Sequence, residues 1–209
     1  MDTKQVVRNL LKHAGTTYAD EAGIRLKDQP MPLFQLLTLA MLASKPIDAT
    51  IAVRAARELF RAGLRTPQTV LAADRADMIN AFGRAHYVRY DESSATRLAD
   101  IAAAVRDDYG GDLRNLATGD VSGTARLLKR FKGIGDTGAD IFLREAQDVW
   151  PWARPYFDKR AVAAARQLGL PSDPDELGAL ARGANAALSA ALVRVSLDDQ
   201  LRTAVQPQP

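Results

Sequence analysis

The chain has 209 residues, of which 47% are hydrophobic and 25% are charged, a composition typical of an ordinary folded globule with one substantial domain or two small ones. Its formal net charge is only +3 although the sequence pI is about 9.3, so any affinity for nucleic acid has to come from local clusters of lysine and arginine. The chain contains no cysteine, which excludes disulfides, a thiolate nucleophile, an iron–sulfur cluster and cysteine-bound zinc.

Helical periodicity of apolar residues recurs along the whole chain, and no run of alternating β-branched residues indicates a strand. We therefore predict an all-α fold. Residues 1–15 lack the apolar core of a signal peptide, and the longest apolar stretch, 36–43, is far shorter than the ~20 residues of a membrane span, so we expect a cytoplasmic protein. Helices are expected at 4–14, 31–44, 48–62, 67–73, 75–82, 91–109, 122–131, 136–148, 159–168, 173–181 and 185–196.

A stiff, non-helical link is predicted at WPWARP, residues 150–155, because it holds two prolines and two tryptophans. We expect the chain to cross there between two helical lobes. One lobe would be a helical bundle of residues 26–149, and the other would combine residues 1–25 with 150–209. The terminal QPQP is expected to fray.

The segment LLKRFKGIGDTGADIFL, residues 127–143, places a Gly-Ile-Gly turn between two helices. Gly133 and Gly135 allow a sharp turn and a close approach of the backbone to a ligand, and the following helix offers free N–H groups and a positive dipole end. Lys129 and Lys132 precede the turn without any acidic residue between 124 and 135, a pattern that favours contact with DNA phosphates. The alternative is a tight helix–helix turn whose glycines serve geometry alone.

This segment, together with YFDKRAVAAARQLGL at 156–170, resembles the helix-hairpin-helix–Gly/Pro…Asp superfamily of base-excision DNA glycosylases, the superfamily of endonuclease III. The family hairpin, Leu-Pro-Gly-Val-Gly-x-Lys-x-Ala, corresponds to FKGIGDTGA at 131–139, and the family's catalytic aspartate corresponds to Asp158, 21 residues after Thr137 (158 − 137). The segments at 32–60 and 83–98 are also similar to family segments. The resemblance covers roughly residues 30–170 and implies a two-lobed helical fold with the lesion cleft between the lobes.

The resemblance implies an enzyme that binds double-stranded DNA with a damaged or mispaired base, flips that base out and hydrolyses its N-glycosidic bond. Asp158 would stabilise the positive charge on the sugar and orient or activate a water, while its alternative role is to cap the next helix. Backbone carbonyls of Lys129, Phe131 and Ile134 would hold a monovalent cation, Na⁺ or K⁺, and no other cofactor is required. The residues expected to contact DNA are Lys45, Lys129, Lys132, Gly133, Ile134, Gly135, Thr137 and Lys159.

Two positions depart from the family pattern. Thr137 stands where bifunctional members carry a lysine nucleophile, and threonine cannot form a Schiff base, so we expect a monofunctional glycosylase. Separately, we expect the protein to be a monomer. Lys45 stands where endonuclease III-like enzymes have a glutamine that fills the gap left by the base; it would bind a phosphate or be an exposed helix end. Two alternatives stay open: AP-lyase activity through a relocated lysine, Lys159 or Lys132, and a lesion-sensing protein without catalysis.

Aromatic and acidic residues near these motifs have two interpretations each. Asp48 and Asp136 are expected to cap the helices that follow them, although Asp48 also falls on a family aspartate. The aromatic residues could stack on an extruded base or belong to the core, and the two beside Asp158 are the best stacking candidates. The aromatic residues considered are Tyr87, Tyr90, Trp150, Trp152, Tyr156 and Phe157.

Overall fold

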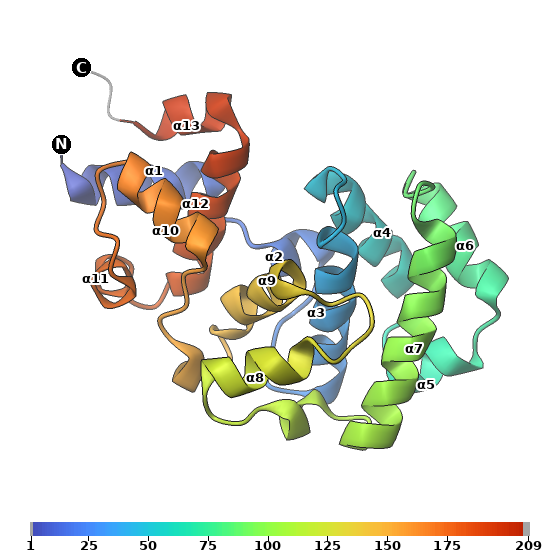
Figure 1. Cartoon of the computed structure of the whole chain (residues 1–209). Helices are drawn as coiled ribbons and strands as arrows, with labels where there is room; N and C mark the ends of the chain where they lie inside the picture. The colour runs from blue at the N-terminus through green and yellow to red at the C-terminus, as the bar shows by residue number, and fades with distance from the viewer. Residues whose placement is uncertain (1, 207–209) are drawn as a thin grey trace. The chain divides into compact units, whose positions relative to one another are not determined.

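The computed structural model describes residues 2–206, and every regular element in that part of the chain is a helix (Figure 1). The predicted all-α fold is thus confirmed. The predicted fraying at 207–209 lies outside the described residues. The helices are α1 Thr3–Ala14, α2 Tyr18–Ala22, α3 Pro30–Ala43, α4 Ala49–Arg61, α5 Pro67–Ala72, α6 Arg75–Arg84, α7 Asp91–Tyr109, α8 Val121–Leu128, α9 Asp136–Ala146, α10 Lys159–Gln167, α11 Pro174–Leu180, α12 Asn185–Leu197 and α13 Asp199–Val205, with 3-10 turns η1 Leu113–Leu116 and η2 Pro151–Ala153.

Each helix expected from the sequence is present, with its ends within about three residues of the predicted ones. Two further helices, α2 and α13, were not predicted. They span only five and seven residues, too few for a helical stripe of apolar residues to stand out. The WPWARP segment, where a non-helical link was expected, contains the short 3-10 turn η2 at Pro151–Ala153.

The chain forms two compact units. Unit 1 comprises Met1–Tyr18 with Leu143–Pro209, and unit 2 comprises Ala19–Phe142. These divisions fall after residues 18 and 142, compared with the predicted divisions after residues 25 and 149. The second division therefore lies inside α9 and not at the WPWARP segment.

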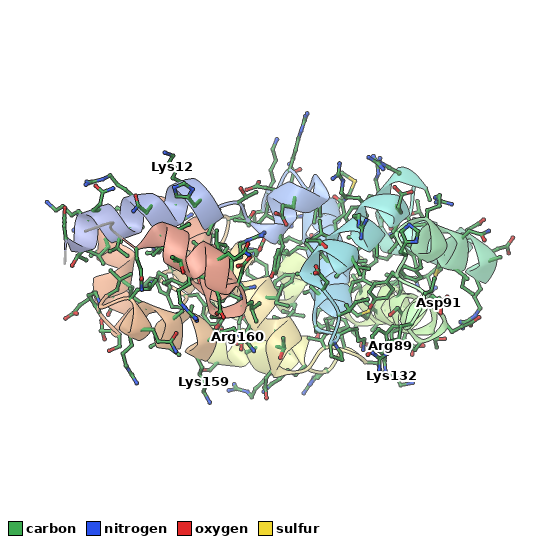
Figure 2. All side chains as sticks on the ribbon, turned by 90° about the horizontal axis from the view of Figure 1, so that it is seen from above. Lys12, Arg89, Asp91, Lys132, Lys159 and Arg160 are labelled. Atoms are coloured by element: carbon green, nitrogen blue, oxygen red, sulfur yellow. The ribbon has the colours of Figure 1, made fainter. Side chains whose placement is uncertain are left out.

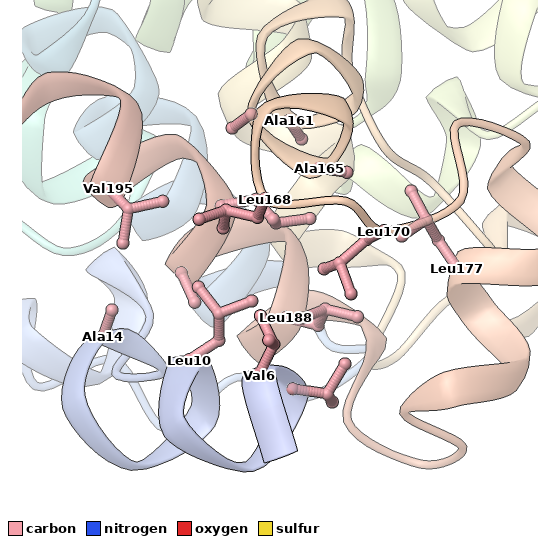
Figure 3. Close-up of a cluster of buried hydrophobic side chains, with 14 of the residues drawn as sticks. Val6, Leu10, Ala14, Ala161, Ala165, Leu168, Leu170, Leu177, Leu188 and Val195 are labelled. Carbon is pink, nitrogen blue, oxygen red and sulfur yellow. The ribbon is translucent and has the colours of Figure 1, made fainter. Parts of the chain in front are cut away.

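Unit 1 is built around α12, which packs against both α1 and α10 (Figure 1). Leucine and valine side chains of α1 and α12 meet the alanine face of α10, and Leu10, Ala161 and Leu188 are fully buried (Figure 3). Small side chains on α10 let the helix backbones approach closely. This core holds the start of α10, where Asp158 lies, in a fixed place.

Unit 2 surrounds α3, whose side chains from Pro32 to Leu42 are all buried. A helix that is apolar on every side belongs in the interior, and α3 accordingly packs against α4, α7 and η1. The buried hydroxyl of Thr38 is satisfied by a 3.0 Å hydrogen bond to the carbonyl of Phe34. Among residues 2–206, no helix combines the length and the apolar character needed to cross a membrane.

Candidate functional site

The hairpin turn connects α8 to α9 within unit 2. The N–H of Ile134 donates to the carbonyl of Phe131 at 3.0 Å, and Gly133 takes φ +93°, a left-handed conformation that favours glycine. The carbonyl of Gly135 accepts the N–H of Ala139 at 3.0 Å, so Gly135 is the residue at the helix boundary. The prediction that Asp136 caps α9 is wrong by one position, because Asp136 is the first residue of the helix.

Two buried side chains fix this turn to the rest of unit 2. Phe131 is 4% exposed and lies 5.7 Å, between ring centroids, from Tyr109 of α7. Ile134 is equally buried and lies against Gly138, where an added Cβ would be 3.3 Å from the Ile134 Cγ2 and 3.7 Å from the carbonyl oxygen of Ala40. The tighter of these two contacts is with the Ile134 side chain, so Gly138 leaves room for Ile134 to pack against the first turn of α9. The anchored turn leaves the backbone at Gly135 exposed.

The lysines of the hairpin are paired with acidic residues. Lys129 Nζ lies 2.8 Å from Asp136 Oδ1, and Lys132 Nζ lies 3.4 Å from Asp100 Oδ2 of α7. The Lys132 side chain is 80% exposed and projects from the ribbon (Figure 2). Exposed pairs of this kind contribute about 0–1 kcal/mol, so a DNA phosphate could replace the carboxylate at little cost.

A basic groove borders the end of α8. Its volume is about 540 Å³, and the charged side chains that line it are Arg126, Lys129 and Arg130. The sequence pattern RLLKR places Arg126 about one helical turn before Lys129 and Arg130, which gathers their positive charge at the end of α8. Positively charged side chains are therefore present beside the end of α8 as well as at the hairpin turn.

Asp158 lies in unit 1 as the N-cap of α10. Its Oδ1 accepts the N–H groups of Arg160 and Ala161 at 2.9 and 3.0 Å, so the capping role that the sequence allowed is present. Its Oδ2 accepts a hydrogen bond of 2.7 Å from Arg144 Nη1. The side chains of Asp158 and Arg144 are 5% and 3% exposed, so this is a buried ion pair.

Arg144 is a site residue that the sequence analysis missed. It belongs to α9, and its guanidinium carbon lies 5.8 Å from the centre of the Tyr18 ring. Its Nε has no hydrogen-bond partner within residues 2–206. The guanidinium therefore has Asp158 as its counter-ion and Tyr18 as an aromatic contact. This ion pair involves the same carboxylate that the sequence analysis assigned to catalysis.

Gln147 is a second residue that the sequence analysis missed. Its side chain is fully buried; Nε2 donates to the carbonyl of Tyr156 at 3.0 Å, and Oε1 accepts the N–H of Tyr156 at 2.9 Å. Nε2 also donates to the carbonyl of Arg144 at 2.8 Å. One amide thus holds the non-helical segment before Asp158 against the end of α9. No feature of the sequence pattern marks a lone glutamine for such a role.

The remaining candidates occupy different environments. Thr137 and Lys159 are exposed in the first turns of α9 and α10, and Figure 2 shows Lys159 directed away from the ribbon. Phe157 belongs to the apolar core of unit 1 and Tyr87 is completely buried in unit 2, so neither is available to stack on a base. Asp48 accepts the N–H of Thr50 at 2.7 Å and caps α4, as predicted.

Cation binding at the hairpin stays a prediction. Of the three carbonyls expected to hold Na⁺ or K⁺, that of Phe131 already accepts the N–H of Ile134, which leaves it one lone pair for a cation. Elsewhere in residues 2–206, no cluster of histidine, aspartate and glutamate side chains could hold a metal ion.

The fold is similar to that of solved structures of endonuclease III. A structure described as a non-covalent endonuclease III–DNA complex matches with a TM-score of 0.51 and 16% sequence identity, over 93% of this chain and 86% of that one. A trapped covalent endonuclease III–DNA intermediate, the estranged-adenine complex, matches with a TM-score of 0.48, the same identity and the same coverage. No family model and no curated protein sequence matches the chain. The chain has the endonuclease III fold, as the helix-hairpin-helix pattern predicted.

Proposed function

We propose that this protein is a DNA glycosylase of base-excision repair, which binds duplex DNA and releases a damaged or mispaired base. The observation that carries the proposal is the hairpin, in which left-handed Gly133 and exposed Gly135 lead directly into the first turn of α9. Free N–H groups and the positive end of a helix dipole suit a phosphate there. The endonuclease III fold supports the same proposal, because the matched structures are complexes with DNA.

The proposed chemistry is hydrolysis of the N-glycosidic bond. Its transition state carries positive charge on the sugar, which a nearby carboxylate stabilises. Asp158 would act mainly through its charge, since three donors already occupy its oxygen atoms and leave little room to bind a water. Thr137 favours hydrolysis without strand cleavage, because a hydroxyl cannot form a Schiff base.

A second candidate is a protein that binds lesions without removing the base. The observation that favours it is the Arg144–Asp158 pair, because a guanidinium 2.7 Å from the carboxylate offsets much of the field that would stabilise a cationic sugar. The two candidates share the hairpin and differ only in whether Asp158 serves chemistry.

The deciding experiment is single-turnover base release from duplex oligonucleotides that carry uracil, oxidised pyrimidines, 8-oxoguanine or alkylated purines. An undamaged duplex of the same sequence is the control, and DNA binding is measured in parallel by fluorescence anisotropy. Base release from one lesion class supports the glycosylase. Tight binding without release from any substrate supports the lesion-binding candidate, and the absence of both overturns the proposal.

A further inference from the structure

Arg97, on α7, lies across the hairpin turn. A Cβ added to Gly133 would be 2.6 Å from the Cδ of Arg97 and 3.3 Å from its Nε. Real Cβ atoms do not approach other heavy atoms so closely, so residue 133 has to lack a side chain as long as Arg97 occupies this place. A side chain at residue 133 would therefore displace the Arg97 side chain, in addition to the strain of a left-handed φ of +93°.

Lys45 follows the C-cap residue of α3, Ser44, and its charge interacts with that of Arg97. Its side chain is partly buried, and this burial together with the nearby Arg97 guanidinium lowers the pKa of Lys45. Burial raises the pKa of the Tyr87 phenol, and Arg97 opposes that rise. The positive charge of Arg97 thus reaches both Lys45 and Tyr87.

A hydrogen-bonded tyrosine connects the two elements that carry these cations. The Tyr87 hydroxyl lies 3.3 Å from the carbonyl oxygen of Leu42 at the end of α3, and 3.4 Å from the hydroxyl of Ser94 in the first turn of α7. The same Leu42 carbonyl accepts the N–H of Lys45 at 3.4 Å. The backbone segments that bear Lys45 and Arg97 therefore both contact the Tyr87 hydroxyl or its partner Leu42, so the two side chains start from the same region of unit 2.

In the part of the chain that the structure describes, Lys45 and Arg97 differ from the hairpin lysines in having no acidic partner. Lys129 and Lys132 each pair with a carboxylate, whereas neither Lys45 nor Arg97 forms an ion pair with any acidic side chain in residues 2–206. Two neighbouring cations on a partly buried surface repel each other, and an anion bound between them removes this repulsion.

We propose that Lys45 and Arg97 together bind one phosphodiester group of a DNA strand beside the hairpin. This inference rests on the proposed function, since the anion is a DNA phosphate, and it adds Arg97 to the residues that bind it. Lys45, which the sequence analysis considered as a phosphate-binding residue, would bind the phosphate together with Arg97. A guanidinium can donate two parallel hydrogen bonds to one phosphate while the ammonium donates a third.

The test compares duplex binding by wild type, Lys45→Met, Arg97→Met and the double variant, by fluorescence anisotropy at several salt concentrations. Methionine keeps an unbranched stem over Gly133 and removes the charge. Arg106→Met is the matched control, because Arg106 is on the same helix and pairs with Asp107 at 2.6 Å. We expect the double variant to lower the slope of log K against log salt by about one unit, the value of one phosphate contact, and the control to leave it unchanged.

A second readout needs no DNA. Since Arg97 lowers the pKa of Lys45, the Lys45 ammonium observed by NMR should titrate at higher pH in Arg97→Met, whose fold is checked by circular dichroism. If Arg97→Met does not fold, Lys45→Met carries the binding test. An unchanged slope in a folded variant of a DNA-binding wild type, or an unmoved Lys45 titration, overturns the two-cation site alone. Failure of the wild type to bind DNA overturns the proposed function and this site with it.

Discussion

Arg144 and Asp158 join the C-terminal half of α9 to the start of α10 through a buried hydrogen bond of 2.7 Å between Nη1 and Oδ2. The removal of both charges from water costs several kcal/mol per ion, and the pair repays this only through close contact and further hydrogen bonds. Asp158 has those further bonds in the N–H groups of Arg160 and Ala161. The pair therefore matters for the fold of unit 1 as well as for any chemistry at Asp158.

Arg144→Met should lower the free energy of unfolding by about 3–5 kcal/mol, because it leaves the Asp158 carboxylate buried without a counter-ion. Arg166→Met on α10 is the control, since Arg166 is exposed and its loss should change stability by less than about 0.5 kcal/mol. Urea unfolding followed by circular dichroism measures both. A loss below ~1 kcal/mol in Arg144→Met would show that the buried pair is not formed in solution.

Asp158→Asn separates the glycosylase from the lesion-binding candidate. If the carboxylate stabilises a cationic sugar, single-turnover base release should fall by about 10²- to 10³-fold while DNA binding persists. The same change leaves Arg144 unpaired in a buried place, so stability falls in either case and a melting temperature alone does not discriminate.

Asp173→Asn provides the control for this experiment. Asp173 caps α11 through the N–H groups of Asp175 and Glu176, in the same manner as Asp158 caps α10, and its hydrogen bonds are exposed. Its replacement should leave base release unchanged. Full release by Asp158→Asn, measured well below its melting temperature, would contradict the catalytic role of Asp158.

The parts of the site that the sequence predicted are those encoded by neighbouring residues. The turn at Gly133 depends on local backbone conformation, and the cap at Asp158 depends on N–H groups two and three residues further on. Both features are visible as short patterns. The helices were predicted for the same reason, because an apolar stripe needs only one continuous segment.

The parts that the sequence did not predict depend on partners from distant segments. Arg144 precedes Asp158 by 14 residues, and Arg97 precedes Gly133 by 36 (133 − 97), so their contacts arise only from packing. The acidic partner of Lys132 also comes from a distant segment. Lys132 follows a stretch without acids, but the fold places Asp100 of α7 3.4 Å from its ammonium group.

Thr137→Lys should create lyase activity, if the resemblance to bifunctional glycosylases extends to this position. Thr137 is exposed in the first turn of α9, so a lysine fits without disturbing the core. Borohydride trapping on a duplex with an abasic site should give a covalent adduct with the variant and none with the wild type, because only an amine forms a Schiff base. An adduct with wild type that disappears in Lys159→Ala or Lys132→Ala would identify a relocated nucleophile and replace the monofunctional proposal.

Gly135→Val tests the hairpin as a DNA contact. Gly135 has open space around its Cα and no left-handed φ, so the fold should accept valine, whereas a side chain at Gly133 would strain the turn and displace Arg97. The new side chain covers the exposed backbone before α9, and loss of one hydrogen bond to a charged phosphate should weaken duplex binding about 10-fold or more. Gly83→Val on α6 is the matched control, because Gly83 is also exposed with open space around it. Equal affinity of folded Gly135→Val and wild type, measured by anisotropy at one salt concentration, would mean that the DNA phosphate does not approach this turn.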